Sequence, residues 1–217
     1  MAKSGKTSSV HEGTGARSTE TRRILVDAAI ATLKKEGFVG ASARAIAEEA
    51  GANQGLIFYH FGTVANLLLA ALDSVSAERL AAYGALVAKT NSPGGLVDVA
   101  TEIFRTDLDA GYMSVLAEMI AGASSTSDLG PEVAARIGPW REFAQSAIEN
   151  SVGDTPFGAM LPAGDLAYAV VALFLGLEML SHLDGNREPA LNLFALAKQL
   201  TELMAALSIP NQSGETS

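Results

Sequence analysis

The chain has 217 residues and a formal net charge of −9. It contains no cysteine, which excludes disulfide scaffolds, thiolate zinc sites and cysteine nucleophiles. The sequence is rich in Ala and Leu, has only 6% aromatic residues and lacks long runs of β-branched residues, so we expect an all-α protein.

Residues 1–18 are rich in Ser, Gly and Thr, and Val10 is their only sizeable apolar residue. We expect a disordered arm, because so few apolar side chains cannot offset the entropy of ordering. Without an apolar core this segment is no secretory signal. Residues 1–60 hold eight Lys/Arg and six Asp/Glu, a basic balance within an acidic chain. That asymmetry is typical of a DNA-facing segment, although solubilising tails of this composition are also common.

Three helices are predicted between residues 19 and 62. The first helix is predicted to begin at Thr19 and end at Gly37, because the apolar residues between them are spaced by three and four. Ser42 is the expected N-cap of a short second helix, which Gly51 stops. Asn53 can cap a third helix that reaches Phe61.

The segment 43–62 has the spacing of a helix-turn-helix. Two short helices that cross steeply need a small residue at their contact, a turn residue that tolerates the left-handed conformation, and an apolar residue on the second helix. Ala47, Gly51 and Ile57 meet these requirements. An ordinary corner between two helices fits the same spacing and stays open as an alternative.

Residues 21–72 closely resemble the DNA-binding region of the TetR family. The similarity is carried by Gly37-Phe38, Ile46-Ala47, Ala50-Gly51 and the run Gly55-Leu56-Ile57-Phe58-Tyr59-His60-Phe61. The resemblance implies a homodimeric transcriptional regulator, a repressor by family tendency, whose third helix enters the major groove of double-stranded, palindromic operator DNA.

The same resemblance, together with side-chain chemistry, predicts the DNA contacts. Gln pairs with adenine and Arg with guanine through two hydrogen bonds each, so Gln54 and Arg44 are the expected base readers. Tyr59 and His60 match phosphate-contacting positions, and Ser42 lies at a helix N-terminus that attracts phosphate. The full predicted set is Ser42, Arg44, Asn53, Gln54, Tyr59, His60 and Thr63. The family usually has a Lys where this chain has Val64, so we expect DNA affinity to depend less steeply on salt.

Beyond Gly62, helices are predicted at residues 64–90, 96–110, 112–124, 131–152, 163–184 and 189–208, between clusters of Gly, Pro, Ser and Asp. The layout resembles that of the family. It implies a helix-turn-helix domain over 19–65, a helical ligand-binding and dimerisation domain over 66–208 and a flexible tail over 209–217. The longest apolar run, residues 166–177, is shorter than the ~20 residues of a membrane span, so we expect a soluble, cytoplasmic protein.

The last two predicted helices carry large apolar surfaces. Residues 166–177 are apolar nearly all round. The final helix has an apolar stripe formed by Leu193, Leu196, Ala197, Leu200, Leu203, Met204 and Leu207. We expect these helices to form a four-helix dimer interface, with burial inside a monomer as the alternative.

Methionine and aromatic side chains of the middle helices predict a pocket for a small, hydrophobic effector, because such side chains adapt to apolar shapes. Each of them fits an ordinary core equally well. The candidates are Phe104, Leu108, Met113, Leu116, Met119, Ile120, Trp140, Phe143, Phe174 and Glu178. Glu178 and His182 share a helix face, and a hydrogen bond between them at the dimer seam is the favoured interpretation, ahead of a polar-ligand or pH-sensitive contact.

We expect no enzymatic activity, cofactor or metal, because the sequence has no Gly-rich phosphate loop, nucleophile elbow or metal-ligand cluster. A helical protein-binding adaptor is the alternative function. If the protein is a repressor, an effector would shift the helix at 64–90 and change the separation of the two DNA-reading heads.

Overall fold

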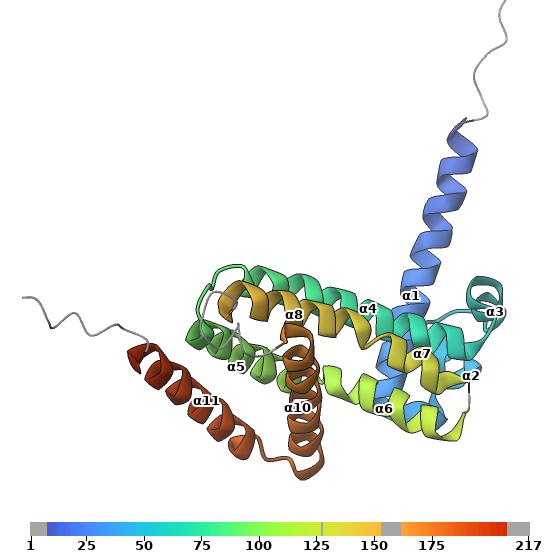
Figure 1. The fold of residues 1–217 in the computed structure, drawn as a ribbon. Helices are drawn as coiled ribbons and strands as arrows, with labels where there is room; N and C mark the ends of the chain where they lie inside the picture. Colours follow the sequence, from blue (N-terminus) through green and yellow to red (C-terminus); the bar gives the residue numbers. More distant parts are fainter. Residues whose placement is uncertain (1–7, 127, 153–161, 208–217) are drawn as a thin grey trace, which may run out of the picture. The chain divides into compact units, whose positions relative to one another are not determined.

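The computed structural model describes residues 8–126, 128–152 and 162–207. These residues form helices joined by turns, with no strand among them, so the all-α prediction is confirmed. In chain order the helices are α1 (Ser8–Gly40), α2 (Ala43–Glu49), α3 (Gly55–Phe61), α4 (Val64–Val87), α5 (Pro93–Ala110), α6 (Tyr112–Ser125), α7 (Leu129–Ala135), α8 (Gly138–Val152), α10 (Ala163–Asp184) and α11 (Glu188–Leu207) (Figure 1).

The helices form two compact units. Unit 1 comprises residues up to Ser76 together with Ser114–Ala134, and unit 2 comprises Ala77–Met113 and the chain from Ala135 onward. Helix α4 therefore contributes to both units. The boundary differs from the predicted one at residue 65, because most of α6 and α7 lies with the N-terminal helices.

Unit 1 has one apolar core to which each of its helices contributes. The most buried contributors include Leu25 and Leu33 of α1, Ile46 of α2, Ile57 of α3, Leu67 and Leu68 of α4, Met119 of α6 and Val133 of α7. The α1 residues recur at the three- and four-residue spacings of one helix face. This core holds α2 and α3 against α1 and α4.

The C-terminal end of α1 is joined to α6. Gly37 has φ 72° and interrupts the regular helix at the predicted helix end, in a conformation that glycine adopts without steric cost. The backbone N–H of Phe38 then donates to Oε2 of Glu118 at 2.8 Å. The Phe38 ring packs on Gly122, where an added Cβ would lie 2.4 Å from ring carbons.

Gly122→Ala is expected to lower the free energy of unfolding by about 1–3 kcal/mol, because the methyl group must displace a rigid ring in a packed core. Gly130→Ala is the matched control, since a Cβ there meets nothing within 4 Å. Urea denaturation of both variants measures the difference. Equal stability of the two would contradict the packing of Phe38 on α6.

Unit 2 packs α10 against α8 and α11 against α5. Three phenylalanine rings join α5, α10 and α11: the Phe104 ring centroid lies 5.9 Å from that of Phe174 and 5.3 Å from that of Phe194. The Lys198 ammonium of α11 donates to Asp98 of α5 at 2.5 Å. Aromatic packing and one ion pair thus fix the last helix to this unit.

Two of the sequence-based helix assignments differ substantially from the structure. Helix α1 begins at Ser8 in place of Thr19, so residues 8–18 are helical where we expected a disordered arm. The hydroxyls of Thr19 and Thr21 donate to the carbonyls of Gly15 and Arg17 in this extension, four residues earlier, which accommodates polar residues in a helix. The single helix predicted at 131–152 is two helices, since Gly138 and Pro139 start a new one. The predicted tail over 209–217 lies outside the described residues.

Candidate nucleic-acid interface and ligand site

The helix-turn-helix is built as its spacing predicted. Gly51 has φ 59° in the turn, and the next amide, of Ala52, donates to the Ala47 carbonyl at 2.9 Å. Ala47 is buried, and Ile46 and Ile57 are fully buried. The small and apolar residues therefore close the wedge between α2 and α3, and the polar residues are left on the outside.

Three of the predicted DNA-binding residues cap helices. The Ser42 hydroxyl oxygen accepts from the Ala45 amide at 3.2 Å, and the Asn53 carbonyl oxygen accepts from the Gly55 amide at 2.7 Å. Thr63 does the same at the start of α4, where its hydroxyl accepts from Asn66 at 3.0 Å. Because the oxygens are engaged, only the O–H or N–H groups of these side chains remain free to donate to phosphate.

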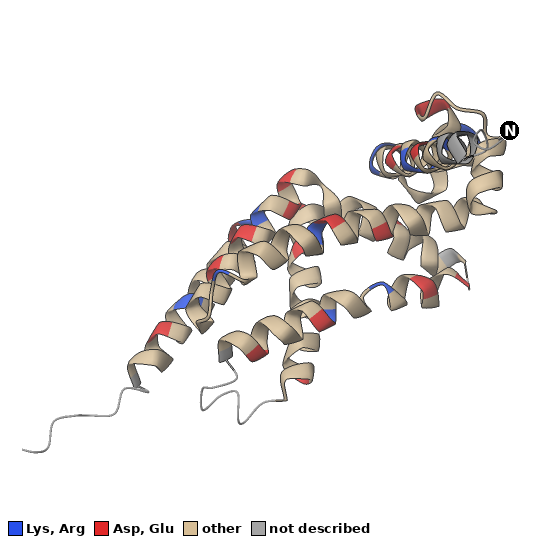
Figure 2. Cartoon of the chain, turned by 90° about the horizontal axis from the view of Figure 1, so that it is seen from above, with Lys and Arg blue, Asp and Glu red and all other residues tan. Residues whose placement is uncertain are grey.

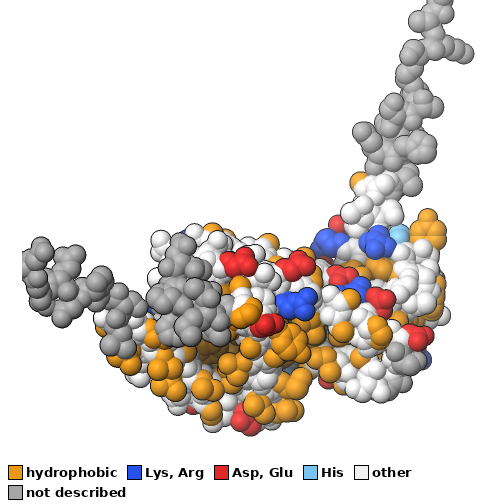
Figure 3. Space-filling view, in the orientation of Figure 1, with side chains coloured by type: hydrophobic (Ala, Val, Ile, Leu, Met, Phe, Trp, Pro, Cys, Tyr) orange, Lys and Arg blue, Asp and Glu red, His pale blue; other side chains and the backbone are white. Residues whose placement is uncertain are grey.

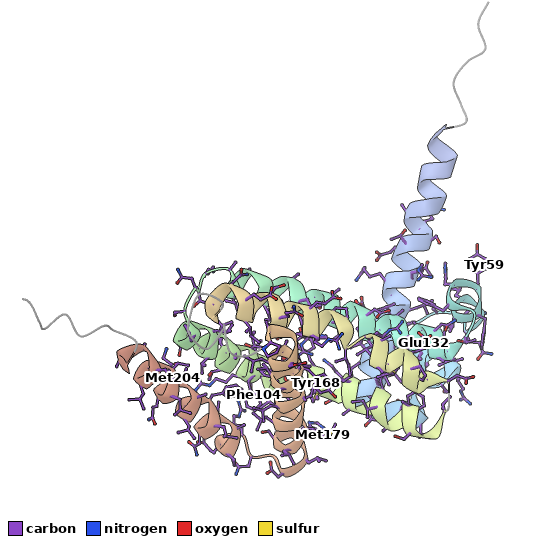
Figure 4. The ribbon with its side chains drawn as sticks, viewed as in Figure 1. Tyr59, Phe104, Glu132, Tyr168, Met179 and Met204 are labelled. Atoms are coloured by element: carbon purple, nitrogen blue, oxygen red, sulfur yellow. The ribbon has the colours of Figure 1, made fainter. Side chains whose placement is uncertain are left out.

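Arg44, Gln54 and Tyr59 are exposed. Neither the Arg44 nor the Gln54 side chain has a hydrogen bond or an ion pair within the described part of the chain, so both side chains are available to an external partner. Tyr59 is 80% exposed and projects outward from α3 (Figure 4). The exposed side chains of α2 and α3 thus combine a guanidinium, a carboxamide and a phenol, which is the chemistry of base and phosphate recognition.

His60 is less accessible than Tyr59. Its side chain is half-buried, with its ring centroid 4.8 Å from that of Tyr59 in an edge-on arrangement. Its backbone carbonyl accepts a hydrogen bond from Arg22 of α1 at 2.5 Å. A phosphate contact by His60 therefore has to use the exposed edge of its ring.

Arg22 was missed at the sequence level. Its guanidinium lies 4.3 Å from the centroid of the Phe61 ring and binds the last turn of α3, where a cation is favoured by the helix dipole. Arg23, by contrast, is paired with Glu20 at 2.7 Å and Asp27 at 2.8 Å on the surface of α1. Figure 2 shows both signs of charge along α1. Arg22 thus helps to orient α3, whereas the charge of Arg23 is compensated by acidic residues of α1 itself.

Val64→Lys is expected to steepen the salt dependence of DNA binding. Val64 is the first residue of α4 and is half-buried, so a lysine there can extend its ammonium into solvent. One added phosphate contact changes the slope of log affinity against log salt by about 0.9 per subunit. Fluorescence anisotropy at several salt concentrations measures the slope, with Val64→Met as the uncharged control. An unchanged slope in Val64→Lys would mean that no phosphate lies at this position.

The predicted pocket residues fall into both units. Leu116, Met119 and Ile120 lie in or against the core of unit 1, with Met119 fully buried there. Phe104, Leu108, Met113, Trp140, Phe143, Phe174 and Glu178 lie in unit 2. The three α6 residues are therefore accounted for by the packing of unit 1, and the unit 2 residues remain as ligand candidates.

A buried ionic cluster lies among those unit 2 candidates. The guanidinium of Arg79 in α4 donates to both carboxylate oxygens of Asp107 in α5, with its Nε 3.0 Å from Oδ1. The Tyr83 hydroxyl also donates to Asp107, and burial raises the pKa of that phenol. Glu178 approaches the same guanidinium at 3.7 Å. Sequence spacing gave no signal for this cluster, because Arg79 and Asp107 are 28 residues apart.

The prediction of a hydrogen bond between Glu178 and His182 is wrong. Glu178 is fully buried, and neither of its carboxylate oxygens has a hydrogen-bond partner within the described part of the chain. His182 is exposed, one turn further along α10. Helix periodicity placed the two residues on one face, but that face passes from the interior to the surface near the end of α10.

Helices α10 and α11 expose large apolar side chains. On α10 they include Leu173, Leu180 and Leu183, and on α11 they include Leu193, Leu196, Leu200 and Leu203. Figure 3 shows apolar side chains gathered over these helices. By length and composition α10 also has the properties of a membrane span, contrary to the expectation from its 12-residue apolar run. A helix at a subunit interface has the same composition.

The comparisons with known proteins agree with this geometry. Residues 25–71 match the family described as "Bacterial regulatory proteins, tetR family". The chain is 31% identical over 105 residues to the HTH-type transcriptional repressor AcnR of Corynebacterium glutamicum, a match over 48% of this chain and 52% of AcnR. The chain thus matches about half the length of this curated relative.

Solved structures share the fold over most of the chain. A TetR family member from Streptomyces coelicolor is 25% identical, with a TM-score of 0.61 over 85% of this chain and 98% of that one. A TetR transcriptional regulator from Chloroflexus aurantiacus is 20% identical, with a TM-score of 0.69 over 85% and 95% of the two chains. The multidrug binding protein EbrR, complexed with imidazole, is 24% identical, with a TM-score of 0.59 over 84% and 93%.

Proposed function

We propose that the chain is a transcriptional repressor of the tetR family that binds operator DNA, because residues 25–71 match that family of bacterial regulatory proteins and the chain is 31% identical over 105 residues to a curated repressor. The observation that carries the proposal is the two-sided character of α3. Its inner side chains Ile57 and Phe61 are buried, whereas Tyr59 and the preceding Gln54 are exposed, inside the segment that matches the family. A helix that reads the major groove needs this division.

In this proposal Gln54 and Arg44 bind base edges. Tyr59, His60, Ser42 and Thr63 bind phosphates, with Asn53 fixing the start of α3. Ser42 and Thr63 donate through their hydroxyl hydrogens, since their oxygens already cap α2 and α4. The protein acts in the cytoplasm, where its DNA is, and has no enzymatic activity of its own.

A small effector would bind in unit 2 and release the protein from its operator. Helix α4 runs from Val64, beside the helix-turn-helix, to Val87 and contributes residues to both units. A displacement of α4 on effector binding would change the separation of the two reading heads. Half-sites are fixed by the DNA pitch, so such a change lowers the affinity of both heads at once.

The protein acts as a homodimer in this proposal, with α10 and α11 as the interface. A single chain leaves Leu173 58%, Leu180 63% and Leu203 57% exposed, a larger apolar surface than an isolated soluble domain usually presents. Pairing with the same surface of a second copy would bury these side chains in a four-helix arrangement.

Leu180→Glu is expected to convert the dimer to a monomer, because it places one charge per subunit in the apolar interface. Sedimentation velocity at micromolar concentration measures the change. Val39→Glu is the matched control, since Val39 is 97% exposed in unit 1. A monomeric unaltered protein, or a dimer that survives Leu180→Glu, would contradict this interface.

The repressor function is tested by selection followed by a reporter. The full-length protein is used to select duplexes from a random-sequence DNA pool, and an inverted repeat with half-sites one helical turn or a multiple apart is expected. The selected operator is then placed across the promoter of a reporter gene. Reduced expression in the presence of the protein supports repression. Increased expression would indicate an activator, and a pool without enrichment would exclude specific DNA binding.

A further inference from the structure

Glu178 has an unusual place on α10. This helix leaves leucines such as Leu180 and Leu183 more than 60% exposed, yet it buries the carboxylate of Glu178 completely. Carboxylates are rarely buried unless they are paired, because desolvation strongly disfavours the charged form. The pattern is the reverse of what stability alone favours, which points to a functional carboxylate.

The neighbouring charges do not satisfy this carboxylate. Asp107 already binds the Arg79 guanidinium through two hydrogen bonds. The nearest Arg79 nitrogen lies 3.7 Å from Oε1 of Glu178, beyond hydrogen-bond distance, and both Glu178 oxygens lack a hydrogen-bond partner among the described residues. Two buried carboxylates therefore share one guanidinium, and the cluster lacks one positive charge.

Aromatic rings lie beside the guanidinium of this cluster. The Arg79 guanidinium carbon lies 4.6 Å from the ring centroid of Trp140 and 5.5 Å from that of Tyr112. Phe174 precedes Glu178 by one turn of α10 and packs on Phe104 at 5.9 Å. Ring faces and apolar walls of this kind bind flat organic groups and attract cations.

The ionisation of Glu178 responds to this environment. Burial raises its pKa to about 7, against the opposing effect of Arg79. The other titratable groups of the cluster are Asp107, Tyr83 and Tyr112, and none of them supplies a positive charge. A cation from outside the chain would therefore bind best when Glu178 has lost its proton.

We propose that Glu178 anchors the effector in unit 2, and that the effector is a small organic cation with a flat apolar body, such as an amidinium or a protonated amine. The N–H groups of the cation donate to the two free oxygens of Glu178, and its body packs on the aromatic side chains. Arg79 does not repel it strongly, because Asp107 neutralises the guanidinium. This inference rests on the proposed function and refines the small, hydrophobic effector expected from the sequence into one that carries a positive charge.

Isothermal titration calorimetry with benzamidine and its uncharged isostere benzamide tests the proposal on the full-length protein at pH 8. We expect benzamidine to bind at least tenfold more tightly than benzamide. Glu178→Gln keeps the shape of the side chain and removes its charge, so it should abolish this preference. Glu188→Gln, at an exposed position of α11, should retain it. A cooperative thermal transition of Glu178→Gln shows that the variant is folded.

Proton release gives a second readout. At pH 6 most Glu178 side chains carry a proton, so benzamidine binding should release close to one proton in the unaltered protein and none in Glu178→Gln. Titrations in two buffers of different ionisation enthalpy measure this number. Equal affinity for the two probes, no benzamidine binding at millimolar concentration, or proton release that persists in Glu178→Gln would each overturn the proposal.

Operator binding separates this inference from the proposed function. Glu178→Gln without a probe should bind the selected operator as the unaltered protein does, because Glu178 is remote in sequence from the helix-turn-helix and lies in unit 2. If the protein binds the operator but binds benzamidine and benzamide equally tightly, the proposed effector class is wrong and the proposed repressor function is retained. If benzamidine binds through Glu178 but no operator is selected, the proposed repressor function is wrong and the proposed ligand site is retained.

Discussion

Asp107→Asn is expected to lower the free energy of unfolding by about 3–5 kcal/mol, because it leaves a buried guanidinium without its hydrogen-bonded counterion. Arg79 is 7% exposed and Asp107 is fully buried, so water cannot replace the lost interaction. The Tyr83 hydroxyl loses its charged acceptor in the same substitution. Glu178, at 3.7 Å, is the only described carboxylate near enough to compensate in part, and it would then be held ionised.

Urea denaturation of Asp107→Asn and of Asp109→Asn measures this effect against a matched control. Asp109 is two residues further along α5 and pairs with Arg187 at 2.9 Å, but its side chain is 64% exposed. Surface ion pairs contribute at most about 1 kcal/mol, so Asp109→Asn should change stability little. Similar losses in both variants would mean that the Arg79–Asp107 pair is not buried in solution.

Gln54→Ala is expected to weaken binding to the selected operator by about 2–6 kcal/mol per dimer, since each bidentate base contact contributes about 1–3 kcal/mol and a dimer makes two. Arg44→Ala should weaken it by a similar amount if Arg44 reads a guanine. Both side chains are exposed, so neither substitution should alter folding. Affinity for a scrambled duplex should change little in Gln54→Ala, because Gln54 carries no charge and releases no counterion from the DNA.

Fluorescence anisotropy with operator and scrambled duplexes measures these changes. Gln145→Ala, on α8 in unit 2, is the control for loss of a glutamine away from the DNA-binding helices. An operator carrying 7-deazaadenine in place of the contacted adenine lacks the N7 acceptor but keeps the N6 donor, so it should reduce the effect of Gln54→Ala. Equal effects of Gln54→Ala on operator and scrambled DNA would remove Gln54 from the base-reading set.

Local signals account for the parts of the fold that the sequence predicted well. Ser42, Gly51 and Asn53 mark helix ends through their own backbone chemistry, and the structure has a cap or a left-handed turn at each. The bounds of α10, residues 163–184, also agree with the prediction. These features depend on neighbours within a few residues, which a single sequence displays directly.

Contacts between distant residues could not be predicted in this way. Glu118 caps Phe38 across 80 residues and brings α6 into unit 1, against the predicted domain boundary. Helix spacing in the sequence predicts a contact between Glu178 and His182, because the two residues are four positions apart. The approach of Arg79 to Glu178 leaves no such pattern in the sequence. For that reason the ligand candidates that the sequence predicts belong to two separate cores.

Specific DNA recognition by residues 42–63 is tested most directly by comparing two dissociation constants. One is measured for the selected operator and the other for a scrambled duplex of equal length, and the ratio is that of the scrambled duplex to the operator. At physiological salt the unaltered protein is expected to bind the operator at least about 10³-fold more tightly. The Arg44→Ala, Gln54→Ala double variant should lose most of this ratio and keep its fold. A ratio near one for the unaltered protein, or a double variant that retains the full ratio, would contradict recognition through α2 and α3.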